Sequence, residues 1–395
     1  MNEILPPPPV AVPLRGVDVP PFYAGKIGRA AAELARAGRS VIPMHFGQPT
    51  AGTPPSALAA ARRVLAEDPT GYFESRELIE RIARHYRERY GLELEPGRIL
   101  LTAGASAALV AVFAALFEAG DRIGVCRPGY PAYRNALRAL GREAVEIDCG
   151  PEVDFRLGPA ALERAGRLHG LVLASPANPT GAMLDRARLA ALIADCRARG
   201  VRLISDEIYH GISYGARAVS ALELDPEAIV INSFSKLFRM PGWRLGWLVA
   251  PKALAARLSA YVVNFFLTPP TLSQHAALAA FDDAAELERS VASYAVNRER
   301  LLAGLTAAGL ERITPPEGAF YLYADVGHLT DDSLAFCRRL LEDTGVALAP
   351  GIDFDPVHGQ RFIRLSFAVT TAQVEEAIAR LGPWLAAQPR RTAGP

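Results

Sequence analysis

The alternation of two sequence patterns between residues 98 and 250 constrains the fold more than any other feature of this chain. Short runs rich in Val, Ile and Leu alternate with longer Ala-, Leu- and Arg-rich stretches whose apolar residues recur with helical period. Several runs are apolar throughout, which is typical of strands buried on both faces of a parallel sheet. Seven candidate strands result, at residues 98–104, 121–126, 143–148, 170–175, 201–206, 228–233 and 244–250.

The stretches between these runs carry the start and stop signals of helices. Residues 185–199 begin at Asp185, a residue type suited to an N-cap, and are followed by Gly200, a natural residue for the position after a helix. A second helical pattern covers residues 106–118. The alternation therefore predicts the α/β class, with a seven-stranded, mostly parallel sheet covered by helices.

After residue 250 the pattern changes. A helix-rich stretch reaches about residue 310, and short β-runs then alternate with helices toward the C-terminus. These patterns predict a second, smaller α+β unit. We expect strands at 319–326, 346–351 and 361–368, a helix near 333–344 and a final helix from Thr371. The first 95 residues hold a Pro-rich arm and helical patterns over 25–37 and 76–90.

Composition narrows the classes of function. With 43 basic and 42 acidic side chains in 395 residues, the chain has no global charge that would favour nucleic acid or an anionic membrane. Its longest apolar stretch, 107–117, has about half of the ~20 residues of a membrane-spanning helix. The four cysteines form no CxxC pair, so we expect no metal and no disulfide framework. The opening residues lack a signal-peptide pattern, and we expect a cytoplasmic protein with a small-molecule partner.

Polar clusters follow five of the predicted strands. Ligands of α/β sheets bind at the carboxyl ends of the strands, so these clusters are the first candidates for a functional site. They cover residues 102–106, 127–133, 175–181, 205–211 and 233–244.

Within these clusters, Lys236 is a candidate nucleophile, because neighbouring arginines and burial would lower the pKa of its amine. Its alternative interpretation is a solvated loop lysine. Asp206 is equally suited to cap a helix, and residues 178–181 alone indicate a turn.

Taken together, six of these positions resemble a known family. Their order and spacing are similar to those of the class I/II aminotransferases, pyridoxal-phosphate enzymes of fold type I, from about Pro20 to Trp384. The six are Asn178, Asp206, Tyr209, Lys236, Arg244 and Arg364. The resemblance implies a homodimer in which residues 48–285 form a large cofactor-binding domain. The small domain would be formed by residues 286–395 together with part of residues 1–47, which also include the N-terminal arm.

The resemblance assigns each of these residues a role toward pyridoxal 5'-phosphate. Lys236 looks like the Schiff-base lysine, which also shuttles a proton between the substrate Cα and the cofactor. Asp206 would keep the pyridine nitrogen protonated, so that the ring accepts electrons. Tyr209 and Asn178 would bind the phenolic oxygen of the cofactor.

The cofactor phosphate and ring have their own implied partners. The backbone amides of Ala105 and Ser106 would open a helix at the phosphate, which is a favourable place for an anion. Tyr130 is similar to the aromatic residue that stacks on the pyridine ring. The other implied phosphate ligands are Ser233, Ser235, Arg244 and, from the second subunit, Tyr72.

For the substrate, Arg364 matches the arginine that clamps the α-carboxylate, with Asn178 nearby. Gly47 would lie over the site, where the absence of a Cβ permits close approach. No second arginine for a dicarboxylate can be assigned. The candidates near the mouth of the site, which favour neutral or aromatic amino acids, are Phe22, Tyr23, Phe266 and Phe320.

The resemblance thus implies an aminotransferase that moves an amino group from an L-α-amino acid to a 2-oxo acid in a ping-pong reaction. A C–S lyase or a related lyase or synthase of the same fold is the alternative, because these reactions begin with the same chemistry at Cα. A ligand-sensing regulator is a third alternative, against which the absence of a DNA-binding segment and the presence of Lys236 both argue.

Overall fold

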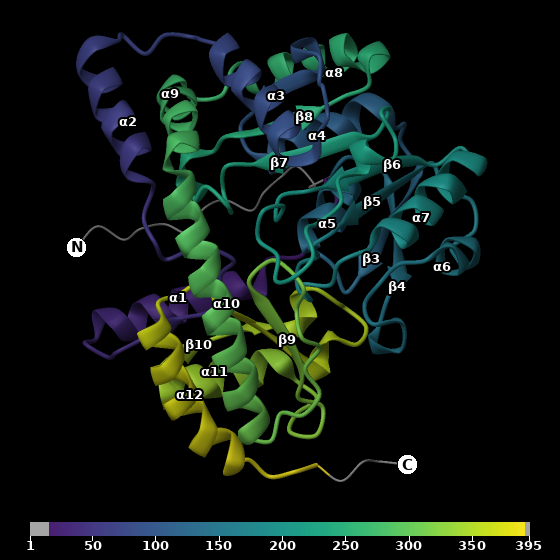
Figure 1. The fold of residues 1–395 in the computed structure, drawn as a ribbon. Coiled ribbons are helices and arrows are strands. Elements are labelled where there is room, and N and C mark those ends of the chain that lie inside the picture. The colour runs from purple at the N-terminus through teal and green to yellow at the C-terminus, as the bar shows by residue number, and fades with distance from the viewer. Residues whose placement is uncertain (1–15, 392–395) are drawn as a thin grey trace, which may run out of the picture.

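The structure is a computed structural model that describes residues 16–391. Two β-sheet regions are visible in it, a large one in the upper part of Figure 1 and a smaller one in the lower part. Most of the predicted Pro-rich arm lies outside the described residues.

The large region is built on one seven-stranded sheet in which each of the seven predicted strands is found. The strand order is β2-β8-β7-β6-β5-β3-β4, and β8 is antiparallel to both of its neighbours. The other adjacent pairs are parallel, which confirms the predicted α/β class with a mostly parallel sheet. The strands are β2 (Ile99–Thr102), β3 (Arg122–Arg127), β4 (Glu143–Asp148), β5 (Gly170–Ala174), β6 (Arg202–Asp206), β7 (Ile229–Ser233) and β8 (Gly246–Val249).

Both faces of this sheet are buried, which explains why its strands are apolar without alternation. In β5, Leu171 and Leu173 belong to one hydrophobic cluster and Val172 to another, on the opposite face. The first face packs against α3 (Arg76–Tyr90), α6 (Pro159–Arg164), α7 (Arg186–Ala198) and α9 (Thr271–Ala280). The second packs against α4 (Ala105–Leu116), α5 (Pro131–Ala139) and α8 (Lys252–Phe266).

The residues predicted to begin and end the helix over 185–199 are found at the two ends of α7. The side chain of Asp185 accepts a hydrogen bond from the amide of Arg188 at the start of α7. Gly200 follows the helix with a φ of +67°, a conformation that glycine adopts without a steric cost. The predicted helices over 106–118, 76–90 and 25–37 are found as α4, α3 and α1 (Tyr23–Arg36).

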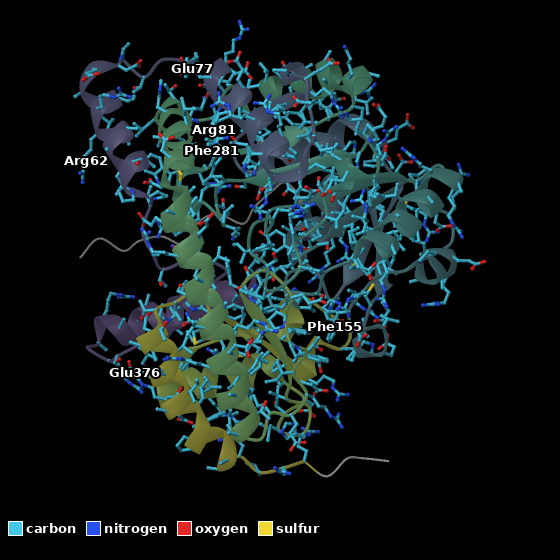
Figure 2. The ribbon with its side chains drawn as sticks, in the orientation of Figure 1. Arg62, Glu77, Arg81, Phe155, Phe281 and Glu376 are labelled. Atoms are coloured by element: carbon cyan, nitrogen blue, oxygen red, sulfur yellow. The ribbon has the colours of Figure 1, made fainter. Side chains whose placement is uncertain are left out.

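Three helices of this region, α2, α5 and α6, were not predicted, and α2 (Pro55–Glu67) is the longest of them. Its apolar face consists largely of small alanines, such as Ala57 and Ala61, so its periodicity is weak in the sequence. The helix is fixed by packing against α9, a contact between segments far apart in the chain. Beside it, the guanidinium of Arg81 in α3 lies 4.1 Å from the ring centroid of Phe281 (Figure 2).

The smaller region combines the two ends of the described chain, as the purple and yellow ribbons of Figure 1 show. Its antiparallel sheet has the order β11-β12-β9, and β1 pairs in parallel with β10. The predicted strand over 346–351 is split into β10 and β11 on either side of Leu348, and each half joins a different sheet. The strands are β1 (Ile42–Pro43), β9 (Tyr321–Asp325), β10 (Val346–Ala347), β11 (Ala349–Pro350) and β12 (Phe362–Ser366).

A large hydrophobic cluster joins the N-terminal and C-terminal parts of the smaller region. Ile27 and Met44 from the N-terminal part are buried together with Leu340 and Phe367 from the C-terminal part. The covering helices are α1, α11 (Ser333–Thr344), α12 (Thr371–Ala386) and the long α10 (Ala284–Ala307), which runs from one region to the other (Figure 1). The domain boundaries after residues 47 and 285 stay a prediction.

Two further findings concern membranes and metals. None of the helices within residues 16–391 combines the length and the apolar character needed to cross a bilayer. The same residues contain no group of three or more His, Cys, Asp and Glu side chains arranged to hold a metal ion.

Candidate active site

A cavity of about 370 Å³, here called the inner cavity, lies where the carboxyl ends of the sheet strands face the smaller region. Because β2, β3, β5, β6 and β7 point the same way, their ends bring residues from distant parts of the chain to one edge. Eleven of the predicted site residues line this cavity: Gly47, Ala105, Ser106, Tyr130, Asn178, Asp206, Tyr209, Ser235, Lys236, Arg244 and Arg364.

Lys236 follows β7 and lies near the centre of this group. Its Nζ donates a hydrogen bond to the backbone oxygen of Gly47, 2.5 Å away. Burial and the positive charges of Arg364 and Arg244 lower the pKa of the amine to about 8, against the opposing effect of Asp206. Near neutral pH a larger fraction of this amine is therefore neutral, and able to act as a nucleophile, than of an ordinary lysine.

Asp206 ends β6 and is buried in the wall of the cavity. Its Oδ2 accepts a hydrogen bond from the hydroxyl of Tyr133 at 2.6 Å, and its Oδ1 accepts one from the amide of Ile208 at 3.1 Å. Burial raises the pKa of this carboxyl, and the two hydrogen bonds and Lys236 act in the opposite direction. A buried carboxylate held in this way is suited to a cationic ring nitrogen.

Arg364, in the middle of β12, is fixed on four sides. Its Nη1 donates to Asn178 Oδ1 at 2.9 Å and its Nη2 to the backbone oxygen of His45 at 2.6 Å. The guanidinium lies between the rings of Tyr321 and Phe354, 4.4 and 4.6 Å from their centroids. Its buried Nε has no hydrogen-bond partner among residues 16–391. An arginine fixed by neutral groups keeps its charge available for an anionic ligand.

The loop between β2 and α4 approaches Arg244 closely. Gly104 has a φ of +83°, and a Cβ on it would lie 2.4 Å from Nη2 of Arg244, so this approach requires glycine. The helix α4 then begins at Ala105 with no side-chain cap from the described residues. Free amides of a first helical turn beside a guanidinium form a binding site for an anion such as a phosphate.

Two predicted ligands lie outside the wall of the inner cavity. Ser233 is buried behind it, where its hydroxyl contacts Ser235 Oγ at 2.8 Å and donates to the backbone oxygen of Leu245 at 3.0 Å. Tyr72 is 85% exposed on the surface. Of the residues expected near the mouth, Phe22 lines the cavity, whereas Phe320 is buried in the core of the smaller region.

Ten lining residues were not predicted as part of the site, and five of them carry aromatic or acidic side chains. The place of Tyr133 could have been inferred, because it lies three residues after Tyr130, one helical turn away on the same side of α5. The other four of these five depend on how the smaller region packs against the large sheet, which no local pattern encodes. The five are Phe46, Tyr133, Tyr321, Asp353 and Phe354.

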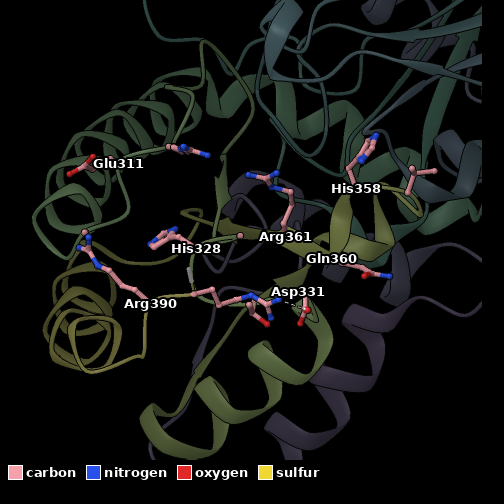
Figure 3. A pocket seen from close by; sticks show the side chains of 13 residues that line it. Glu311, His328, Asp331, His358, Gln360, Arg361 and Arg390 are labelled. Carbon is pink, nitrogen blue, oxygen red and sulfur yellow. Dashed lines mark ion pairs between the residues drawn. The ribbon is translucent and has the colours of Figure 1, made fainter. Parts of the chain in front are cut away.

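A second cavity of about 780 Å³, here called the outer cavity, lies on the smaller region and contains none of the predicted site residues (Figure 3). Its basic side chains are largely paired with acids. Arg361 lies 2.7 Å from Asp325, and Arg391 lies 2.7 Å from Asp331. The charged and polar side chains of its wall include Glu311, Arg312, His328, His358, Gln360 and Arg390.

The seven-stranded sheet, and the cavity at its strand ends lined by a lysine, an aspartate and two arginines, agree with one class of protein, the pyridoxal-phosphate enzymes of the aspartate-aminotransferase type. The family model "Aminotransferase class I and II" matches residues 39–381, and the chain belongs to this family. It is thus a pyridoxal-phosphate-dependent transaminase.

Individual relatives agree with this assignment. The chain is 47% identical over 378 residues to a valine–pyruvate aminotransferase of Mycobacterium tuberculosis, covering 94% of this chain and 97% of the relative. It is 30% identical to an aspartate aminotransferase of Geobacillus stearothermophilus, with 95% and 98% covered. These relatives support transamination and give no support to the lyase alternative.

Solved structures show the same fold. The crystal structure of an aminotransferase from M. tuberculosis matches with a TM-score of 0.91 and 47% identity, covering 94% of this chain and 98% of that one. The aspartate aminotransferase of Thermus thermophilus with maleate matches with a TM-score of 0.87 and 32% identity, covering 94% and 100%.

The inner cavity fits the family's cofactor in its donor set. Pyridoxal phosphate carries a phosphate, a ring nitrogen and an aldehyde. The glycine-dependent cradle at Gly104 and Arg244 suits the first, the buried Asp206 the second and the Lys236 amine the third.

Proposed function

We propose that the inner cavity carries out the transamination, with Lys236 as the covalent attachment point of pyridoxal phosphate and as the proton carrier. The observation that carries this proposal is the convergence of three charged residues on one cavity: Lys236 and Asp206 from strand ends of the large sheet, and Arg364 from β12 of the smaller region. When bound, the cofactor supplies an electron-withdrawing ring that accepts the electron pair left at the substrate Cα.

In this proposal the chain's own residues bind, orient and move protons. Arg364 binds the substrate carboxylate through its planar guanidinium. Because Asn178 already holds this guanidinium in place, the side chain loses little conformational entropy when the substrate binds. Lys236, once its amine is free, takes the proton from Cα, and its lowered pKa suits that step. Asp206 holds a proton on the ring nitrogen, and Tyr133 keeps this carboxylate in place.

The phosphate and ring contacts follow from the same arrangement. Arg244 and the first amides of α4 would bind the phosphate, together with the hydroxyls of Ser106 and Ser235. Ser233 would act through its contact with Ser235. Tyr130, whose ring lines the cavity, would stack on the pyridine.

We propose that the amino donors have neutral side chains and that pyruvate is an acceptor. The name of the valine–pyruvate relative supports this choice. So does the wall of the inner cavity, where the described residues offer no basic side chain for a second substrate carboxylate besides Lys236, Arg244 and Arg364. Phe22, Phe46 and Phe354 offer apolar surface to the substrate side chain.

We further propose a cytoplasmic homodimer with the large domain at 48–285 and the small domain at both ends. Several large apolar side chains in the N-terminal part are exposed in the single chain, which supports the proposal that a second subunit covers this surface. Among them are Phe22, Phe46, Leu65 and Tyr72. In such a dimer, Tyr72 would reach the phosphate of the partner subunit. Sedimentation of the holoenzyme tests this, and a monomer that binds cofactor tightly would overturn it.

A screen of amino donors with pyruvate or 2-oxoglutarate tests the reaction and its substrate class. We expect turnover with valine, alanine or aromatic amino acids and little with aspartate. Release of ammonia and pyruvate from cysteine or cystathionine, without any acceptor, would instead support a lyase. Borohydride reduction followed by peptide mapping should leave the cofactor on the peptide that contains Lys236.

A further inference from the structure

Tyr321 is buried in the wall of the inner cavity and contacts three parts of the site. It belongs to β9 of the smaller region, whereas Tyr209 follows β6 of the large sheet. The two hydroxyl oxygens are 2.7 Å apart. The guanidinium of Arg364 lies 4.4 Å from the centroid of the Tyr321 ring. A Cβ on Gly47 would come within 1.8 Å of the Tyr321 hydroxyl, so this segment is packed directly on it.

The bond between the two hydroxyls has a direction that matters. A phenol has one proton to donate, and its oxygen can accept another hydrogen bond. Tyr209 can give its proton to the cofactor's ring oxygen only if it accepts the proton of Tyr321 instead of donating to it.

We propose that Tyr321 is a positioning residue that donates its hydroxyl to Tyr209, directs the Tyr209 proton toward the cofactor oxygen and supports Arg364 with its ring. This rests on the proposed roles of Tyr209 and Arg364. It links the carboxylate clamp on the smaller region to the cofactor contacts on the large sheet through one side chain.

The surroundings of Tyr209 and Tyr321 keep both phenols protonated, which the proposed hydrogen bonds require. Burial raises the pKa of both Tyr209 and Tyr321 above the usual value for tyrosine, although Arg364 lowers both. Tyr321 and, less strongly, Tyr130 add to the rise in the pKa of Tyr209, whereas the hydrogen bond with Tyr209 lowers the pKa of Tyr321. The Nζ of Lys236 lies 5.8 Å from the centroid of the Tyr209 ring. Both hydroxyls therefore carry their protons at neutral pH.

The experiment compares two hydroxyl deletions on the same strand. Tyr323 is also buried in β9, and its hydroxyl has no hydrogen-bond partner among the described residues, so Tyr323→Phe is the matched control. The measurement is the pH midpoint of the visible absorbance change of the holoenzyme, together with KM for the amino donor.

We expect Tyr321→Phe to raise this midpoint by about 0.5–1 pH unit, because Tyr209, no longer polarised by the proton of Tyr321, donates a weaker hydrogen bond to the anionic cofactor oxygen. KM should stay within about twofold, because the ring under Arg364 remains. Tyr321→Leu should raise both the midpoint and, by about fivefold, KM. Tyr323→Phe should change neither.

A midpoint that does not move in Tyr321→Phe overturns the proposal. The variant Tyr209→Phe then shows whether the role assigned to Tyr321 or the role assigned to Tyr209 is wrong. If Tyr209→Phe shifts the midpoint and Tyr321→Phe does not, only the role of Tyr321 is wrong. If neither shifts it, the assignment of Tyr209 to the cofactor oxygen is wrong as well.

Discussion

The inner and outer cavities differ in how their charged side chains are partnered. In the inner cavity, Lys236, Arg364 and Asp206 are held by backbone atoms and neutral side chains, and they keep their charges for a ligand. In the outer cavity, Arg361 and Arg391 lie against carboxylates of the protein itself. The outer cavity is about twice as large, at about 780 Å³ against 370 Å³.

The partnering of the charges, and not the volume, is therefore the reason for assigning the ligand to the inner cavity. Charges that neutralise one another at a surface contribute little to stability and offer little to an anion. Charges that are buried and held by neutral donors and acceptors are costly for the fold, and they persist where they bind a ligand. Substitutions in each cavity test whether the partnering of the charges decides where the ligand binds.

The largest expected effect is at Lys236. Lys236→Ala removes both the nucleophile and the proton carrier, and we expect transamination to fall by at least about 1000-fold. Borohydride should no longer fix the cofactor to the protein, as absorbance of the denatured chain would show. A variant that retains more than a tenth of the activity would contradict the proposal that transamination depends on Lys236 in the inner cavity.

A smaller effect is expected at Arg364. Arg364→Lys keeps the charge and loses the planar pair of donors, so KM for the amino donor should rise by about 10–100-fold, with kcat less affected. Steady-state kinetics at saturating acceptor measure this. An unchanged KM would mean that the carboxylate binds elsewhere.

The pH dependence of cofactor capture tests the electrostatics of the inner cavity. The neutral amine of Lys236 is the reactive form, so the rate at which apoenzyme binds pyridoxal phosphate covalently should rise with pH around a midpoint of about 8. Arg364→Gln removes a cation that lowers this pKa, and the midpoint should move to higher pH. A shift to lower pH would show that the assigned cause is wrong.

The smallest effect is expected in the outer cavity. Arg361→Ala breaks an ion pair whose arginine is 47% exposed, and we expect unchanged kcat/KM and a free energy of unfolding lower by at most about 1 kcal/mol. Activity assays and urea unfolding measure the two quantities. A tenfold loss of activity would give the outer cavity a function that its ion pairs do not indicate.

The sequence predicted the large sheet well because its strands are buried on both faces and their signal is local. The polar clusters at the strand ends could be located for the same reason, whereas the roles of Lys236, Asp206 and Arg364 rest on the family resemblance and stay predictions. Tyr321, Asp353 and Phe354 were missed as site residues, because their place depends on how two regions pack. The helix α2 was missed because alanines give a weak amphipathic pattern, and the helix is stabilised by packing against α9, which lies far away in the sequence.

The pairing of β1 with β10 also has a consequence for the synthesis of the chain. Its two partners, around Ile42 and Val346, are about 300 residues apart. At the ~5–20 residues per second of translation, the first strand waits about 15–60 seconds for the second to be made. During that time the apolar side chains of Ile27, Ile42 and Met44 have no core to enter, although the strands of the large sheet have all left the ribosome earlier. Occupancy by chaperones during translation should therefore centre on the N-terminal 50 residues.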